Sequence, residues 1–164
     1  MIYLYLGSSL ADGPGGGRRL TIVRALNKLS DRGIDVVDTS SIYEAEPYPK
    51  SSNPWFVCMV AAIETEHSPI DLLQECKLVE YELGRSRNRP GTPRVIDIDL
   101  LVYNNITDER LGLTIPHENL PDTAAYLIPL QEIDPDWIHP ETDQPIQAMV
   151  NQLSDQMINK LKYP

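Results

Sequence analysis

Three short stretches of the chain are rich in apolar and β-branched residues, as is typical of strands. These stretches lie at residues 2–6, 34–44 and 55–65, and the third is richer in apolar residues than the second and is therefore expected to be more central. A fourth apolar run, 94–103, is interrupted by two aspartates. Helical spacing of apolar residues predicts helices at 18–30, 68–83, 124–133 and 146–161. Strands interleaved with helices, with an early pair that can run antiparallel, predict an α+β sandwich with helices on one main face.

Capping residues mark the ends of the first two predicted helices. Ser68, Pro69 and Asp71 form an N-cap, a first-turn proline and a capping-box acid, so the second helix begins there. Gly33 and Gly84 stand where each helix should end. The inner side of the first helix is expected to carry Ile22, Val23, Leu26 and Leu29. The inner side of the second is expected to carry Leu72, Cys76, Val79 and Leu83.

The two aspartates within residues 94–103 indicate metal chemistry. Strand side chains alternate between faces, so Asp97 and Asp99 should share one face, about 7 Å apart along the chain. The opposite face should carry Ile96, Ile98, Leu100 and Val102. Mg²⁺ takes oxygen ligands and binds through one or two carboxylates plus the phosphates of a substrate, so the pair predicts an anchor for a metal–nucleotide. The alternative interpretation is a solvated strand face with no further role.

A cluster of arginines precedes the aspartates. Arg85, Arg87, Arg89 and Arg94 fall within ten residues, although the chain carries a formal net charge of -10. A basic island in an acidic protein suits a small polyanion better than a nucleic acid. Guanidinium groups pair bidentately with phosphate oxygens, and the proline and glycine among them favour a loop that closes over the ligand. A solvated charged loop is the alternative, but together with the aspartates the cluster predicts phosphoryl transfer.

The chain as a whole is predicted to be one domain, residues 1–164, of ordinary globular composition. Residues 2–6 have strand length and lack a basic flank, so neither a secretory signal nor a membrane span is expected. Cys58 and Cys76 lack metal-site spacing and lie in apolar runs, which predicts buried reduced thiols in a cytoplasmic protein. The three prolines of residues 46–54 predict a long irregular loop, a type of segment that is often functional.

Two runs, 91–101 and 113–117, resemble the 6-hydroxymethyl-7,8-dihydropterin pyrophosphokinases of folate biosynthesis. The resemblance extends through residues 6–10, 40–47 and 55–57. It implies the ferredoxin-like α/β plait, an antiparallel sheet with helices packed on it, with additional C-terminal elements. It also implies diphosphate transfer from ATP, with magnesium, to the hydroxyl of 6-hydroxymethyl-7,8-dihydropterin, which gives AMP.

The resemblance also implies roles for individual residues. Asp97 and Asp99 would hold two Mg²⁺ ions, and Arg85 and Arg94 would stabilise the transferred charge, so these four are the expected catalytic residues. ATP contacts are implied for Leu73, Lys77, Glu80, Arg87, Leu100, Leu113, Thr114 and His117. Pterin contacts are implied for Ala45, Glu46, Tyr48, Phe56 and Cys58.

Some of these residues have simpler interpretations when taken alone. Lys77 and Glu80 fit a solvated helix face equally well. Phe56 fits plain core packing as well as stacking on a flat ring. His117 fits the cap of a loop better than a phosphate ligand, and only the resemblance reverses that preference.

The chain departs from the family pattern around the pterin. The family commonly has Thr, Asn, Arg and Phe at the positions of Ala45, Cys58, Thr123 and Ala125. Each polar atom of a buried pterin left unpaired would cost about 1–3 kcal/mol. A second hypothesis is therefore a divergent paralogue that acts on another flat alcohol, and a third is a nucleotide-binding module without catalysis. The expected partners are small molecules, with no nucleic acid or membrane, and the expected state is a monomer.

Overall fold

The structure is a computed structural model that describes residues 1–9, 17–84, 95–110 and 112–162. The predicted arginine loop, with Arg85, Arg87, Arg89 and Arg94, lies outside the described residues. The main sheet contains β1 (Ile2–Ser8), β2 (Ile34–Thr39), β3 (Tyr43–Ala45), β4 (Phe56–Thr65), β5 (Asp97–Tyr103) and β8 (Ile158–Lys160). A separate hairpin contains β6 (Asp108–Arg110) and β7 (Leu113–Ile115). The α-helices are α1 (Arg18–Ser30), α2 (Pro69–Glu82), α3 (Ala124–Ile133) and α4 (Ile146–Asn151).

The topology of the main sheet is that of a ferredoxin-like plait. The sheet runs in the order β5-β1-β4-β3-β8, with β2 also paired to β4, and every pair is antiparallel. Read through β1, α1, β2, β4, α2 and β5, this is the βαββαβ unit with its first and third strands in the centre. The predicted fold class, an α+β protein with helices packed on an antiparallel sheet, is confirmed.

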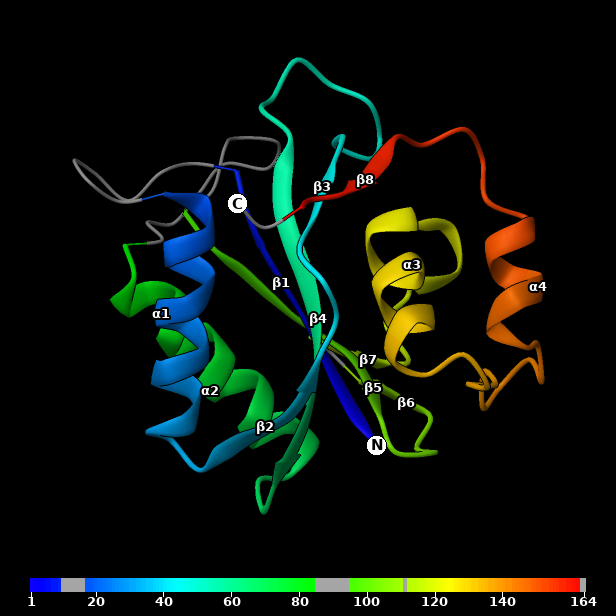
Figure 1. Cartoon of the computed structure of the whole chain (residues 1–164). Helices are drawn as coiled ribbons and strands as arrows, with labels where there is room; N and C mark the ends of the chain where they lie inside the picture. The colour runs from blue at the N-terminus through cyan, green and yellow to red at the C-terminus, as the bar shows by residue number, and fades with distance from the viewer. Residues whose placement is uncertain (10–16, 85–94, 111, 163–164) are drawn as a thin grey trace.

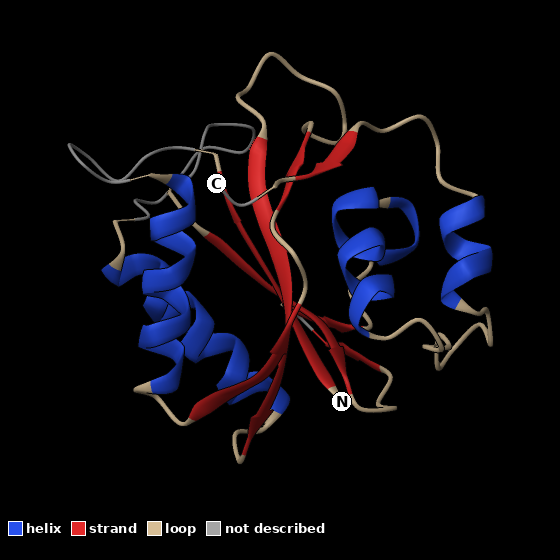
Figure 2. Cartoon of the chain, in the orientation of Figure 1, coloured by secondary structure: helices blue, strands red, loops and turns tan. Residues whose placement is uncertain are grey.

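Helices cover both faces of the sheet, not one main face as the sequence suggested. Helices α1 and α2 lie on one face and α3 and α4 on the other (Figures 1 and 2). Each interface has its own apolar cluster: Leu4, Leu6 and Ile98 belong to the α1/α2 side, and Leu127 and Leu130 to the α3 side. The sheet is therefore the middle layer of three. No helix in the described part of the chain is long and apolar enough to cross a membrane.

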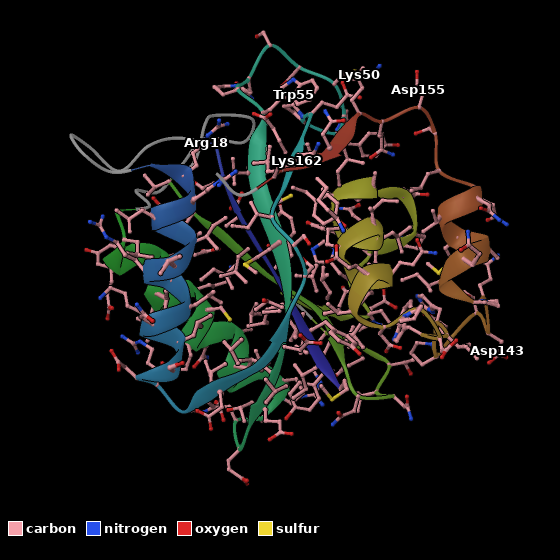
Figure 3. The ribbon with its side chains drawn as sticks, in the orientation of Figure 1. Arg18, Lys50, Trp55, Asp143, Asp155 and Lys162 are labelled. Carbon is pink, nitrogen blue, oxygen red and sulfur yellow. The ribbon has the colours of Figure 1, made fainter. Side chains whose placement is uncertain are left out.

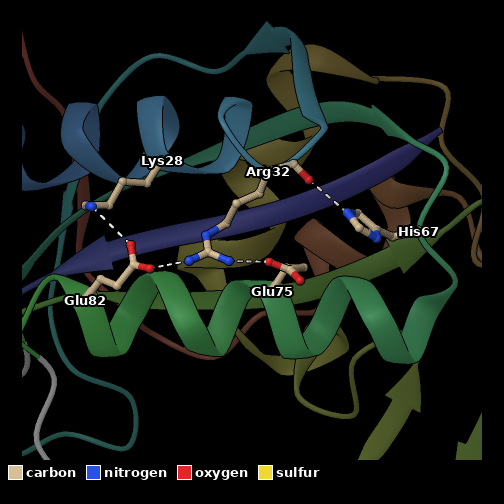
Figure 4. A network of polar contacts seen from close by, with 5 residues as sticks. All are labelled: Lys28, Arg32, His67, Glu75 and Glu82. Atoms are coloured by element: carbon tan, nitrogen blue, oxygen red, sulfur yellow. Dashed lines mark hydrogen bonds and ion pairs between the residues drawn. The ribbon is translucent and has the colours of Figure 1, made fainter.

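A polar network joins α1 to α2 outside the apolar core (Figure 4). The guanidinium of Arg32, just after α1, bridges Glu75 at 2.6 Å and also pairs with Glu82. Lys28 adds a second contact to Glu82 at 3.1 Å, and the His67 ring donates to the Arg32 carbonyl at 2.9 Å. These groups lie at the surface, so they orient the two helices more than they stabilise the fold.

The predicted strand 34–44 is two strands, because Ser40 interrupts it. The Ser40 hydroxyl accepts a hydrogen bond from the Val60 N–H at 3.0 Å, in place of a backbone carbonyl. Strand β2 pairs with one half of β4, and β3 continues along the other half. The predicted helix 146–161 is also wrong beyond Asn151, since its last residues form β8 on the free edge of β3.

Two apolar residues do not lie where periodicity placed them. Val23 is 46% exposed, because the buried side of α1 follows Thr21, Ile22, Ala25 and Leu29. Val102 packs on the α3 side with Leu101, whereas Ile98 and Leu100 lie on the α1/α2 side. The pairing of β1 with β5 jumps from Leu100 to Val102, so a bulge turns the end of the strand over. The predictions for Cys58 and Cys76 as buried free thiols are confirmed.

Candidate active site

Asp97 and Asp99 lie on the same face of β5, as the alternation predicted. Asp97 is opposite Gly7 on β1, and Asp99 is opposite Tyr5. Both aspartates are half-buried, whereas Ile98 and Leu100, on the opposite face, are buried. A rigid strand therefore presents two carboxylates to partly solvated space at one edge of the molecule.

Two cavities meet at Asp99. The first, called the edge pocket here, has a volume of about 370 Å³ and lies between α2, β5 and the segment after β6. Its walls are Leu73, Lys77, Glu80, Ile98, Asp99, Leu100, Gly112, Leu113, Thr114, His117 and Glu118. These include every predicted ATP residue that the structure describes. The structure thus gathers residues from α2, from β5 and from the segment that contains β7 around one cavity.

Glu80 is a wall of the edge pocket and not a solvated residue. Its side chain is 3% exposed, and Oε1 accepts a hydrogen bond from the Ile98 N–H at 2.8 Å. Ile98 lies between the two aspartates on β5, which is the edge strand of the main sheet within the described residues. Glu80 therefore satisfies a backbone donor that the sheet leaves open, and it fixes the aspartate strand to α2. Lys77, one turn earlier on α2, is exposed and also lines the pocket.

His117 caps a loop, as its simpler interpretation predicted, and it also lines the edge pocket. Its ring Nδ1 accepts from the Asn119 backbone N–H at 3.1 Å, and the backbone N–H of His117 donates to the Leu101 carbonyl at 2.8 Å. Because Nδ1 is the acceptor, the proton of the neutral ring is on Nε2. One residue can thus hold the loop after β7 against β5 and still offer a donor to a phosphate.

The second cavity, called the inner pocket, lies on the α3 side of the sheet and has a volume of about 130 Å³. Both Asp97 and Asp99 line it, together with Tyr5, Ala45, Glu46, Tyr48, Phe56, Thr123, Ala124, Ala125, Tyr126, Gln156 and Met157. Four of the five predicted pterin residues are among these walls. The Trp55 carbonyl accepts from Arg18 at 2.7 Å, which fixes the chain before Phe56 to the start of α1. Figure 3 labels both residues.

Cys58, the fifth residue predicted to contact a pterin, does not line the inner pocket, and its contact with a pterin stays a prediction. Cys58 is fully buried and is not part of the inner pocket wall, because Tyr5 lies against it. Gly7 makes room for this phenol: a Cβ there would lie 2.3 Å from the Tyr5 hydroxyl. Burial raises the pKa of the Cys58 thiol to about 12, so it is a neutral packing group.

Sequence reasoning missed two tyrosines of the inner pocket. The Tyr126 hydroxyl donates to Oδ2 of Asp99 at 2.8 Å, and its ring packs edge-on against Tyr5 with centroids 4.8 Å apart. Burial raises the pKa of both phenols, and the Asp99 charge adds to the effect on Tyr126. Both therefore stay neutral. The alternation of β1 could have placed Tyr5 on the aspartate face, but nothing in the sequence pairs Tyr126 with Asp99.

The C-terminal segment closes the other side of the inner pocket, which the sequence analysis also missed. Gln156 accepts from the Ala124 N–H at 3.0 Å and donates to the Asp122 carbonyl at 2.8 Å, so it caps the start of α3. Glu46 accepts from the Met157 N–H at 2.7 Å. Thr123 uses its hydroxyl within its own loop, where it donates to the Asn119 carbonyl at 2.7 Å.

The donor set at the junction of the pockets suits magnesium. Among the described residues, no group of three or more His, Cys, Asp or Glu side chains could hold a metal by itself. Mg²⁺ does not need such a cage, because it keeps waters and takes its remaining ligands from substrate phosphates. Asp97 and Asp99 supply hard oxygen donors beside a cavity of nucleotide-sized volume, so these residues fit the ion.

The chain is similar in sequence and in fold to known proteins. The family model described as 7,8-dihydro-6-hydroxymethylpterin-pyrophosphokinase (HPPK) matches residues 3–135. A 2-amino-4-hydroxy-6-hydroxymethyldihydropteridine pyrophosphokinase of Methylorubrum extorquens is 40% identical over 139 residues, which cover 83% of this chain and 84% of the relative. The corresponding Haemophilus influenzae protein is 37% identical over 139 residues, 85% of each chain.

Some relatives are much longer than this chain. The folic acid synthesis protein fol1 of Schizosaccharomyces pombe is 39% identical over 157 residues, which cover 95% of this chain but 21% of the relative. The chain thus spans about a fifth of the length of that protein. A crystal structure of wild-type Plasmodium falciparum HPPK-DHPS with pteroate superposes with a TM-score of 0.73, at 14% identity, over 92% of this chain and 44% of that one. This likeness supports the fold.

Proposed function

The chain belongs to the 7,8-dihydro-6-hydroxymethylpterin-pyrophosphokinase family, and from that premise we propose that it transfers a diphosphate group from ATP to the hydroxyl of 6-hydroxymethyl-7,8-dihydropterin. The hydroxyl oxygen forms a bond to the β-phosphorus and loses its proton. The bond from the β-phosphorus to the bridging oxygen on the α side breaks, and AMP leaves with that electron pair. This reaction is a step in folate biosynthesis.

The observation that carries this proposal is the shared wall of the two cavities. Asp99 lines both the edge pocket and the inner pocket, and Asp97 lines the inner pocket beside it. A nucleotide in the edge pocket would direct its phosphates toward the aspartates, and an acceptor in the inner pocket would approach the same point from the other side. Holding two reactants in this way replaces a bimolecular encounter by a positioned one.

Asp97 and Asp99 are the residues that would hold magnesium, and we assign them two ions. When bound, the metal neutralises triphosphate charge and fixes the orientation of the phosphates. Glu80 holds the aspartate strand in place, and His117 offers its Nε2 proton to a phosphate oxygen. We assign stabilisation of the transferred charge to Arg85 and Arg94, with Arg87 in support. We also propose that the chain acts as a monomer on small-molecule substrates.

One observation favours a second candidate, transfer to a different flat alcohol. The inner pocket contains Ala45, Thr123 and Ala125, where the family pattern has larger or more polar side chains, and Tyr5 covers Cys58. The phenol of Tyr5 therefore takes part of the space that an acceptor would occupy. A ring that bonds to a phenol would fit such a wall.

AMP release tests the proposal. The protein is incubated with ATP, Mg²⁺ and 6-hydroxymethyl-7,8-dihydropterin, and we expect AMP in amounts equal to the pterin diphosphate formed. Asp97→Ala and Asp99→Ala should each abolish AMP release without loss of the fold. Asp35→Ala, which removes an exposed aspartate of β2, should leave it unchanged. Near-normal turnover in either site variant contradicts the metal assignment.

The same assay separates the candidates. AMP formed only with another hydroxylated flat ring supports the second candidate. Tight ATP binding without AMP for any acceptor supports a nucleotide-binding module and overturns the proposed reaction.

A further inference from the structure

Tyr126 makes a contact that none of the roles above requires. It belongs to α3, on the opposite face of the sheet from α2, and its hydroxyl donates to Asp99 Oδ2 at 2.8 Å. Asp99 is half-buried on a rigid strand, so its carboxylate has few orientations to choose from. The phenol selects one of them. A carboxylate offers about four acceptor positions, so this bond leaves others for a metal.

The position of the Tyr126 ring is itself set by packing. Its ring meets Tyr5 edge-on at 4.8 Å and 65°, and His117 edge-on at 5.2 Å and 73°. These neighbours come from the central strand β1 and from the loop after β7. The start of α3 is capped by Gln156, so the helix that carries the phenol is held as well. The hydroxyl is therefore placed before any ligand binds.

We infer that Tyr126 is a positioning residue, which orients the Asp99 carboxylate for the metal–nucleotide and couples the two pockets at that point. Groups that hydrogen-bond a metal-ligating carboxylate fix its direction, and their loss typically weakens metal affinity 10- to 100-fold. The inference rests on the proposed function, in which Asp99 is a metal ligand. It goes beyond that function because it assigns a role to a side chain of α3, which lines the inner pocket.

The coupling has a directional consequence for kinetics. Tyr126 lines the inner pocket, while the carboxylate it holds lines the edge pocket too. Removal of the hydroxyl should therefore raise the KM for the metal–nucleotide more than the KM for the acceptor. A residue that only packed α3 on the sheet would not produce this difference.

Tyr126→Phe tests the inference, since it keeps the ring and removes the hydroxyl. The matched control is Tyr103→Phe, which removes another hydroxyl bond, 2.6 Å to the His67 carbonyl, at the other end of β5. Mn²⁺ serves as the probe, and its binding in the presence of a non-hydrolysable ATP analogue is followed by electron paramagnetic resonance. We expect about 10-fold or greater weakening in Tyr126→Phe and less than about twofold in the control.

Two results would overturn the inference: Mn²⁺ affinity within twofold of wild type, or tighter binding, which would mean that the phenol competes with the metal for Asp99. Circular dichroism checks that each variant is folded. Asp99→Ala separates the role of Tyr126 from the assignment of Asp99 as a metal ligand. If Asp99→Ala loses Mn²⁺ while Tyr126→Phe keeps it, only the role of Tyr126 fails. If Asp99→Ala also binds Mn²⁺ normally, the metal assignment of the proposed function fails.

Discussion

Replacement of Glu80 by alanine is the substitution whose effect the structure defines most closely. The Glu80 carboxylate is buried and accepts the Ile98 N–H at 2.8 Å. Alanine removes the acceptor and leaves this backbone donor buried without it. An unsatisfied buried donor costs about 1–3 kcal/mol, so Glu80→Ala should lower the free energy of unfolding by about 2 kcal/mol.

Urea denaturation measures this loss. With an m-value of about 2 kcal/mol/M, a loss of about 2 kcal/mol moves the midpoint down by about 1 M. Glu80→Gln retains a carbonyl oxygen at the same position, so its midpoint should fall much less. Glu82→Ala is the surface control: that carboxylate is exposed on the same helix and bonds only to long cationic side chains among the contacts in Figure 4.

The urea midpoints of the three variants should differ, with Glu80→Ala the lowest. If Glu80→Ala and Glu82→Ala had the same midpoint, the bond to Ile98 would contribute nothing to stability. If Glu80→Gln were as unstable as Glu80→Ala, the oxygen would not be the acceptor that matters. Either result would also remove the argument that Glu80 fixes the aspartate strand.

Three further predictions concern the rest of the fold. Burial raises the pKa of Cys58 and Cys76 from 9.0 to about 12. Above pH 9 the unfolded chain therefore loses protons that the folded chain keeps, and the free energy of unfolding should fall by about 1.4 kcal/mol per thiol per pH unit; equal urea midpoints at about pH 8.5 and 10.5 would contradict this. Gly7→Ala should cost about 1–3 kcal/mol, because its Cβ would meet the Tyr5 ring, and less in a Tyr5→Leu background. Equal costs in both backgrounds would refute the clash. Ser68→Ala should lower the free energy of unfolding, measured by urea denaturation, by about 1 kcal/mol, because α2 loses its N-cap. An unchanged free energy would show that the cap does not stabilise the protein.

Local patterns predicted those parts of the fold that local chemistry decides. Ser68 caps α2 where the sequence placed it, since its side chain accepts a backbone N–H in the first turn. The two aspartates share a face because the strand period is two and the bulge comes after them, at Leu101. Val102 comes after the bulge and therefore lies on the α3 side of the sheet, opposite to the face that alternation predicted.

The parts that failed depend on contacts between distant segments. Residues 158–160 form a strand because the edge of β3 is available to pair with them, which helical periodicity cannot show. Tyr126 meets Asp99 across 27 positions of sequence, and Tyr5 covers Cys58 only once β1 and β4 are paired. The walls of the inner pocket were therefore harder to predict than those of the edge pocket, which include every predicted ATP residue that the structure describes.

The proposed reaction requires that Asp97 and Asp99 hold the metal on a triphosphate whose nucleoside lies in the edge pocket. A crystal structure with Mn²⁺ and a non-hydrolysable ATP analogue tests this directly through the anomalous signal of the metal. We expect anomalous density against both carboxylates, with the base between Leu73 and Leu113. Density at another site, with both carboxylates free of metal and the analogue outside the edge pocket, would contradict the proposed reaction.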